Sequence, residues 1–353
     1  MLRWRLAPVN VPRRRLGTTP ALCPESLPGS HVQKPRGASH AREDTHAGSR
    51  PERHGQAVTP ADLSLWLSAR VRVLDGGLTG ELLRRGVADA SRLWGVGALL
   101  EAPEAVRSLH GEYAAAGADA LTAATFRVAP YALRRHHLEV RASALARHAV
   151  TLARQAAATT GALVLASQTS LEDCYRPDLA PDVSVQRREH AATARLLADA
   201  EPDGLLLETF SSAQEASVAA RAATATGLPV LVSFACGARG VLLSGEDAAN
   251  AAAAVTLPGV VAVGVNCTAV AHMDAALARL ARGTRLPLVA YANNGFSAED
   301  SPWLSAETMD GEGFAQAAES WHRLGARLLG GCCGTGPAHI SALARRLARH
   351  RLE

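Results

Sequence analysis

Short runs of aliphatic and β-branched residues recur along most of the chain, with stretches of helical periodicity between them. The eight apolar runs are 71–77, 120–126, 163–168, 204–210, 230–236, 260–267, 286–294 and 327–333. Amphipathic helical stretches between and after them include 103–116, 142–158, 187–200, 213–225 and 337–351. Continuous apolar runs of this length are typical of strands buried in a parallel sheet.

Eight strands that alternate with helices predict parallel βαβ units with right-handed crossovers. Eight such units can close into a (β/α)8 TIM barrel, and a doubly wound open sheet is the alternative. Nearly every apolar run ends in polar or reactive residues. A barrel gathers such ends on one face, whereas an open sheet spreads them along an edge, so the pattern favours the barrel.

The beginning of the chain has a different character. Residues 1–57 are rich in Pro, Gly, Ser, His and Arg, and they show neither a helical nor an alternating hydrophobic period. We expect a disordered extension there, which is a transit peptide, a non-functional extension or the product of a start assigned too far upstream. Thr59 followed by Pro60 predicts the first helix, so the barrel domain is expected to span 58–353.

Composition and charge narrow the classes of partner. The chain has 353 residues, 48% of them hydrophobic, and a net charge of +4 whose basic surplus lies near the N-terminus. We expect no nucleic-acid partner, because no global basic patch is present and the aromatics are not interleaved with arginines. No stretch approaches the roughly 20 apolar residues that span a bilayer. We therefore expect a cytoplasmic protein without a membrane partner, as a monomer or small homo-oligomer.

The cysteines carry the candidate chemistry. Six are present, and their sparse placement is not that of a secreted disulfide framework, so we interpret them as reduced thiols. Cys332 and Cys333 are adjacent, which disfavours a disulfide between them. The flanking residues Gly330, Gly331 and Gly334 let the backbone turn both sulfurs toward one point, and a helix starting at Pro337 favours negative sulfur.

Cys267 ends the sixth run, so a barrel brings its sulfur to the same face as Cys332 and Cys333. Thiolates select Zn²⁺ among the common ions, and three protein ligands leave a fourth position open for substrate. The alternatives are ordinary buried cysteines, or a closed structural site completed by Cys236. For Cys174, after the third run, we favour loop packing over ligation.

Several segments carry a family resemblance. They are LDGGLTGELLRRG (74–86), LWGVGALLEAPEAV (93–106), GADALTAATF (117–126), LLLETF (205–210), SFAC (233–236), GVNC (264–267) and GGCCGTGPAHI (330–340). Together they resemble the homocysteine S-methyltransferases over residues 60–353. The resemblance implies a barrel whose zinc lies at the strand ends on three cysteines, matching Cys267, Cys332 and Cys333.

The resemblance also implies that Asp75 and Glu208 hold the amino-acid end of homocysteine. Carboxylates accept hydrogen bonds from an ammonium, and backbone N–H groups near Gly76 and Gly77 can receive the substrate carboxylate. We assign Asn293, at the end of the seventh run, to the same substrate site. The alternative for Asp75 is a helix N-cap.

Two positions depart from the family pattern, and two further features have a plain structural interpretation. Ala124 stands where many relatives have asparagine, and Ala292 where many have proline, which puts the substrate or donor pocket in doubt. We interpret the glycines of GGLTG (76–80) as a turn, since their spacing fits neither phosphate-binding fingerprint. His339 is expected to be a surface residue early in the last helix.

The expected reaction is methyl transfer to a thiol. Zinc with three thiolates carries a formal charge of about −1, and about −2 with a substrate thiolate, which favours a cationic methyl donor. We expect S-methylmethionine or S-adenosylmethionine, because the chain ends soon after Cys333 whereas betaine-using relatives carry a longer C-terminal region. Alternatives are a non-catalytic zinc-stabilised barrel and another acceptor such as selenocysteine.

Overall fold

All eight predicted apolar runs form strands. The computed structural model describes residues 57–87, 93–295 and 308–349. Its strands are β1 Arg72–Val73, β2 Ala120–Ala123, β3 Leu163–Gln168, β4 Gly204–Phe210, β5 Val230–Phe234, β6 Val260–Ala269, β7 Leu288–Asn293 and β8 Ala326–Gly331. The extension expected at 1–57 lies, apart from its last residue, outside the described residues.

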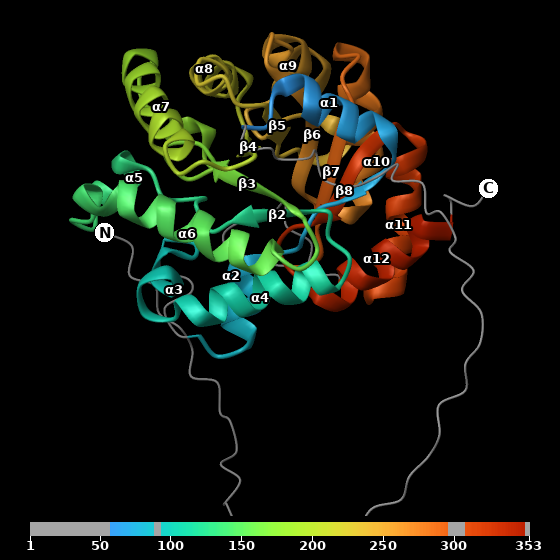
Figure 1. Ribbon diagram of the computed structural model, residues 1–353. Helices are drawn as coiled ribbons and strands as arrows, with labels where there is room; N and C mark the ends of the chain where they lie inside the picture. Colours follow the sequence, from blue (N-terminus) through green and yellow to red (C-terminus); the bar gives the residue numbers. More distant parts are fainter. Residues whose placement is uncertain (1–56, 88–92, 296–307, 350–353) are drawn as a thin grey trace, which may run out of the picture. The chain divides into compact units, whose positions relative to one another are not determined.

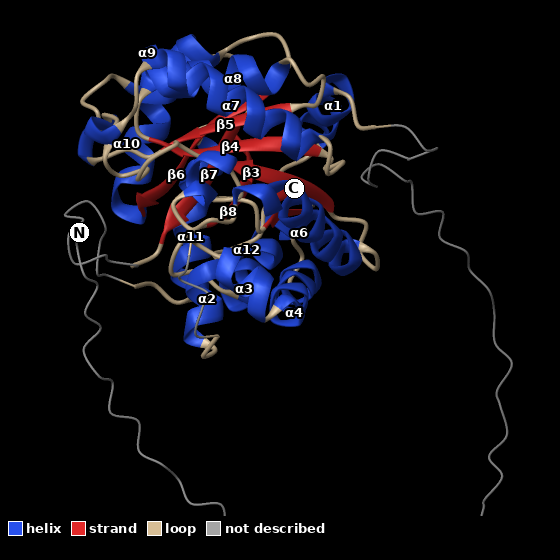
Figure 2. Ribbon diagram, turned by 90° about the vertical axis from the view of Figure 1, so that its left-hand side faces the viewer, coloured by secondary structure: helices blue, strands red, loops and turns tan. Residues whose placement is uncertain are grey.

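The strands are parallel and form a closed barrel. Their order is β1-β8-β7-β6-β5-β4-β3-β2, and a parallel bridge between Leu74 and Ala120 joins β1 to β2. The Asp75 N–H donates to the Ala120 carbonyl at 3.1 Å across this seam. The sheet with its outer helices is seen from two sides in Figures 1 and 2. The predicted (β/α)8 barrel is confirmed, and the open-sheet alternative is wrong.

Helices follow or precede each strand. They are α1 Pro60–Ala69, α2 Leu78–Arg84, α3 Val96–Glu101, α4 Pro103–Ala115, α5 Pro130–Arg134, α6 Ala142–Ala157, α7 Val183–Ala198, α8 Ala213–Thr224, α9 Ala248–Val255, α10 Val270–Leu280, α11 Gly311–Arg323 and α12 Pro337–Arg349. The five stretches expected to be helical correspond to α4, α6, α7, α8 and α12. None of the helices in the described ranges is long and apolar enough to cross a membrane.

The segment GGLTG is only partly the turn that we expected. Gly76 and Gly77 lead out of β1, but α2 already begins at Leu78. Leu82 is fully buried and Leu78 packs against the same core. Burial of this apolar pair, one helical turn apart, outweighs the cost of about 1 kcal/mol for Gly80 inside a helix.

Helix α1 covers the amino-terminal end of the barrel. Thr59 caps it as predicted, since its hydroxyl accepts from the Asp62 N–H and the Asp62 carboxylate accepts from the Thr59 N–H. Trp66 and its neighbours pack with inward-facing strand residues such as Leu163 and Val261. The amino-terminal end is thereby filled, and the opposite end, where the strands finish, remains for chemistry.

Candidate metal and substrate site

The strand ends surround a cavity of about 120 Å³. Seven of the eight residues predicted to bind metal or substrate line it, namely Asp75, Gly76, Gly77, Glu208, Cys267, Cys332 and Cys333. Asn293 is buried at the end of β7 and is not among the lining residues. Its part in substrate binding stays a prediction, while the other seven are brought together as a barrel requires.

Three sulfurs form the centre of the site. The Cys267 Sγ lies 2.8 Å from the Cys332 Sγ and 3.5 Å from the Cys333 Sγ, and all three lie within 4.8 Å of one another. Hydrogen bonds with Cys332 and Cys333 lower the pKa of the Cys267 thiol well below its usual range. These contacts favour the thiolate form of Cys267, which is the form that binds metal.

Backbone strain turns Cys267 into the cavity. Its φ is +47°, and the pairing of β6 with β7 shifts register between Asn266 and Ala269. Thr209 in β4 has a φ of +60°. The Asn266 side chain in β6 links these two strained positions. It accepts from the Thr209 N–H and donates to the Thr209 hydroxyl, both at 2.8 Å. Such strain persists only where its surroundings hold it.

The paired cysteines are held against the end of β7. The Cys332 N–H donates to the Ala292 carbonyl at 2.9 Å, and the Asn294 N–H donates to the Cys333 carbonyl at 2.8 Å. A Cβ at Gly331 would lie 2.2 Å from the Thr335 Oγ1, and Gly334 has a φ of +76°. A side chain would clash at Gly331, and the positive φ of Gly334 disfavours any side chain there, so these glycines allow the turn that presents the sulfurs.

The sulfur set fits zinc. With a zinc–sulfur distance of about 2.3 Å, a tetrahedral centre places its sulfurs about 3.8 Å apart. The 3.5 Å separation of Cys267 and Cys333 is close to this value, and the 2.8 Å separation of Cys267 and Cys332 needs to open by about 1 Å. Three soft donors at the edge of an open cavity match a zinc site with one free position.

No fourth cysteine joins the group among the described residues. Cys236 is buried outside it, and burial raises the pKa of its thiol to about 12. The closed four-sulfur alternative is therefore wrong. Cys174 is buried in the cavity wall, likewise outside the group, and burial raises its pKa to about 12. Its place agrees with the expected packing role.

The two predicted carboxyls are buried. Asp75 accepts from the Thr122 N–H at 2.7 Å and from the Thr122 hydroxyl at 2.9 Å, while the Ser167 hydroxyl donates to Glu208. Burial raises the pKa of Asp75 to about 8 and that of Glu208 to about 7. Since Gly77 is the N-cap of α2, the N-cap alternative for Asp75 is wrong.

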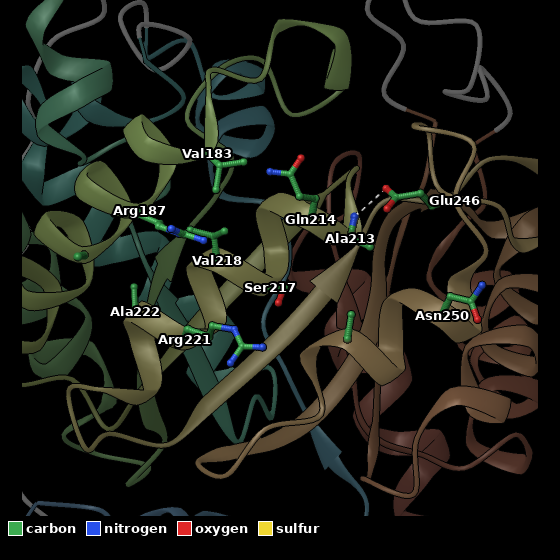
Figure 3. A pocket seen from close by; sticks show the side chains of 12 residues that line it. Val183, Arg187, Ala213, Gln214, Ser217, Val218, Arg221, Ala222, Glu246 and Asn250 are labelled. Atoms are coloured by element: carbon green, nitrogen blue, oxygen red, sulfur yellow. Dashed lines mark hydrogen bonds between the residues drawn. The ribbon is translucent and has the colours of Figure 1, made fainter.

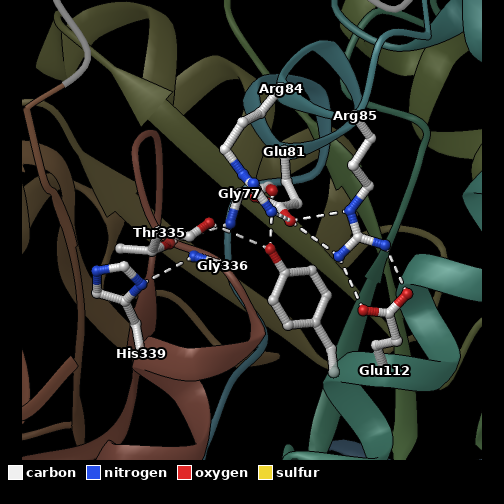
Figure 4. Close-up of polar contacts among 9 residues, drawn as sticks. Gly77, Glu81, Arg84, Arg85, Glu112, Thr335, Gly336 and His339 are labelled. Carbon is white, nitrogen blue, oxygen red and sulfur yellow. Dashed lines mark hydrogen bonds and ion pairs between the residues drawn. The ribbon is translucent and has the colours of Figure 1, made fainter. Parts of the chain in front are cut away.

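A second network fixes the glycine segment (Figure 4). The Gly77 N–H donates to the Thr335 hydroxyl at 3.2 Å, and the Tyr113 hydroxyl donates to the Gly77 carbonyl at 2.8 Å. The Gly77 N–H is thus already bonded, so its expected contact with a substrate carboxylate stays a prediction. His339 lies early in α12, as expected, and is half-buried; its Nδ1 accepts from the Gly336 N–H at 3.1 Å. This contact fixes the start of α12.

Sequence reasoning missed several contributors to the site. The Tyr175 hydroxyl lies 3.0 Å from the Cys267 Sγ. The Tyr291 hydroxyl is buried close to Glu208 and Ser233, and burial raises the pKa of this phenol well above its usual range. Trp94 and Phe126 complete an aromatic wall of the cavity, and Ala124 lines it too. The departure from the family pattern at Ala124 therefore lies in the cavity itself.

A larger groove lies elsewhere on the barrel. It has a volume of about 760 Å³ and is lined by residues of α7, α8 and α9, among them Arg187 and Arg221 (Figure 3). Glu246 accepts there from the Ala213 N–H at 2.9 Å. None of its lining residues is a cysteine or a strand-end residue named above, so we place the chemistry in the smaller cavity.

These features define the class: a (β/α)8 barrel enzyme with a cluster of three cysteine sulfurs at the carboxyl ends of its strands. Residues 72–347 match the family model described as homocysteine S-methyltransferase, and the chain belongs to this family. It is 34% identical over 298 residues to an Escherichia coli (strain K12) homocysteine S-methyltransferase, covering 78% of this chain and 95% of that protein. It is 32% identical over 302 residues to homocysteine S-methyltransferase 4 of Zea mays, covering 77% and 88%.

A solved structure agrees with this assignment. The metallated form of the homocysteine methyltransferase MmuM from Escherichia coli superposes with a TM-score of 0.68 at 32% identity, covering 78% of this chain and 96% of that one. The resemblance inferred from the motifs is thus confirmed at the level of family and fold.

Proposed function

We propose that this protein is a zinc-dependent methyltransferase that transfers a methyl group from a sulfonium donor, S-methylmethionine or S-adenosylmethionine, to the thiol of homocysteine, giving methionine. One observation carries the proposal: a cluster of three sulfurs and two buried carboxyls share a single cavity. The sulfurs suit a metal that binds thiols, and the carboxyls suit an amino acid's ammonium group. A homocysteine molecule carries both groups.

Cys267, Cys332 and Cys333 would hold the zinc. When bound, zinc stabilises the thiolate form of a thiol substrate at neutral pH, which makes the substrate sulfur a nucleophile. The solved relative described as metallated supports a metal in this family. The exclusion of Cys236 from the sulfur group supports an open site, and it removes the main reason for a purely structural zinc.

Asp75 and Glu208 would bind the substrate ammonium. Thr122 fixes both oxygens of Asp75, and Ser167 fixes Glu208, so the carboxylates are oriented before the substrate arrives. Burial raises the pKa of both carboxyls. An ammonium that enters between them would compensate their charge and favour the ionised forms.

The cavity also suits a cationic methyl donor. Trp94, Phe126 and Tyr175 supply aromatic faces, which attract sulfonium and quaternary ammonium groups. In the transfer, the thiolate sulfur forms a bond to the methyl carbon while the donor's sulfur–methyl bond breaks, and its electron pair remains on the donor sulfur. Positive and negative charges are both neutralised, which a cavity of low polarity favours.

A donor-by-acceptor matrix on the purified protein tests this proposal, with bound zinc counted in the same sample. Donors are S-methylmethionine, S-adenosylmethionine and betaine, and acceptors are homocysteine and selenocysteine. We expect methionine from homocysteine with a sulfonium donor and about one zinc per chain. Transfer from betaine alone would contradict the donor assignment, and transfer to selenocysteine alone would contradict the acceptor. The cytoplasmic location and the oligomeric state stay predictions.

A further inference from the structure

We propose that Tyr175 is a positioning residue of the zinc site: its hydroxyl donates a hydrogen bond to the Cys267 sulfur and thereby sets how tightly the three cysteines hold the metal. This inference rests on the proposed zinc site. It assigns a function to a residue of the loop between β3 and α7.

The contact joins the phenol to the central sulfur of the cluster. The Tyr175 Oη lies 3.0 Å from the Cys267 Sγ, and the same sulfur lies next to Cys332 and Cys333. A tyrosine hydroxyl is protonated at neutral pH and can donate, while a thiolate can only accept. The Tyr175 side chain also lines the cavity. The hydroxyl is therefore placed to contact a metal ligand from the substrate side.

Buried polar contacts fix the start of this loop. The Leu171 N–H donates to the Glu215 carboxylate at 2.9 Å. The His190 Nε2 lies 3.1 Å from the same carboxylate oxygen, and the His190 Nδ1 lies 2.8 Å from the Gln168 amide nitrogen. Gln168, His190 and Glu215 are all buried. These contacts tie the end of β3 to α7 and α8, so the loop leaves the barrel in a defined direction.

A second set of contacts holds the loop closer to Tyr175. The Arg127 guanidinium donates to the carbonyls of Ser170 at 2.9 Å and Glu172 at 2.7 Å. The Tyr131 hydroxyl donates to the Glu172 carboxylate at 2.7 Å. These contacts anchor residues 170–172, so the fold itself holds the segment that leads to the phenol. Preorganised partners of this kind orient metal ligands.

The expected consequence concerns metal affinity. A hydrogen bond to a ligating thiolate orients the sulfur and spreads its negative charge. Loss of a partner to a metal ligand typically weakens metal binding about 10- to 100-fold. Tyr175→Phe removes only the hydroxyl and keeps the ring. We therefore expect this variant to bind zinc about 10- to 100-fold more weakly than the wild type.

Competition with a chromophoric zinc chelator measures this affinity on the full chain. Tyr131→Phe is the matched control, because it removes a phenol hydroxyl that contacts the same loop through Glu172 but contacts no sulfur. We expect the control to bind zinc as the wild type does. Equal affinity of Tyr175→Phe and the wild type would overturn the inference, and so would an equal loss in both variants, which would indicate general loosening of the loop.

Cobalt substitution supplies a readout specific to the sulfur. With the hydrogen bond removed, the thiolate is more electron-rich, so the sulfur-to-cobalt charge-transfer band of Tyr175→Phe should shift to longer wavelength, while that of Tyr131→Phe should not. An unshifted band in Tyr175→Phe would contradict the contact. A wild type that binds no metal would instead contradict the proposed function, and the two failures are therefore distinguishable.

Discussion

The two buried carboxyls make substrate binding a proton-releasing event. With a pKa of about 8, Asp75 is about nine-tenths protonated at pH 7, and Glu208, with a pKa of about 7, is about half protonated. An ammonium that binds between them favours their ionised forms. Binding of an amino acid at pH 7 should therefore release between about one and one and a half protons.

The sign of the pH dependence follows from the same groups. Burial raises both pKa values, and the ionised carboxylates are the forms that bind the ammonium. Affinity should therefore rise with pH up to about 8 and then level off until the substrate amine itself loses its proton. Below pH 7, it should fall about tenfold or more for each pH unit.

Calorimetry with an amino acid that lacks sulfur, such as norleucine, isolates this effect from the metal. Titrations at pH 7 in buffers of different ionisation enthalpy count the released protons. Asp75→Asn should lower the count by about 0.9 and weaken binding by about 1.5–3 kcal/mol, or roughly 10- to 150-fold, through loss of the charged hydrogen bond. Its side-chain oxygen can still accept one bond from Thr122.

Asp178→Asn is the control, because Asp178 pairs with Arg176 in the loop after β3 and does not line the cavity. It should leave both the proton count and the affinity unchanged. Binding by the wild type without proton release would refute the reasoning, as would an unchanged count in Asp75→Asn. Either result would mean that these carboxyls do not receive the ammonium.

Three further predictions concern the supports of the site. Asn266→Ala leaves the Thr209 N–H without its acceptor, so we expect a loss of about 2–3 kcal/mol in the free energy of unfolding by urea and weaker zinc binding. Glu215→Ala removes the carboxylate that the Leu171 N–H and the His190 Nε2 contact. Thermal denaturation should report a loss of about 3 kcal/mol in the free energy of unfolding. Removing the metal with a chelator should abolish methyl transfer, yet circular dichroism should show the barrel retained, because its core is built without the metal.

The sequence was sufficient for the barrel and the sulfur set because both depend on simple patterns. Buried parallel strands are continuous apolar runs, and a closed barrel brings the ends of distant runs to one face. Cys267 and Cys332 are 65 residues apart, yet their sulfurs meet for this reason. Asp75 lies two residues after β1 and lines the same cavity, but its binding role was implied by the family resemblance and not by the pattern.

The roles of the residues that sequence analysis missed depend on loop and strand geometry, which leaves no periodic pattern in the sequence. Tyr175 lies in a loop of irregular backbone, and its contact with Cys267 results from anchors on α7, α8 and the β2–α5 connection. Asn266 stands beside Cys267 in the motif GVNC, but its role depends on a register shift that periodicity cannot predict. Tyr291 belongs to an apolar run, so its inward hydroxyl looked like ordinary core.

The central claim is that three cysteines hold a zinc ion that activates the substrate thiol in an otherwise self-supporting barrel. The most direct test is the zinc content and methyl-transfer rate of Cys267→Ala beside Cys236→Ala, with folding followed by circular dichroism. We predict that Cys236→Ala keeps about one zinc per chain and its activity, whereas Cys267→Ala loses both and stays folded. Zinc or activity retained in Cys267→Ala, or unfolding of that variant, would contradict the account.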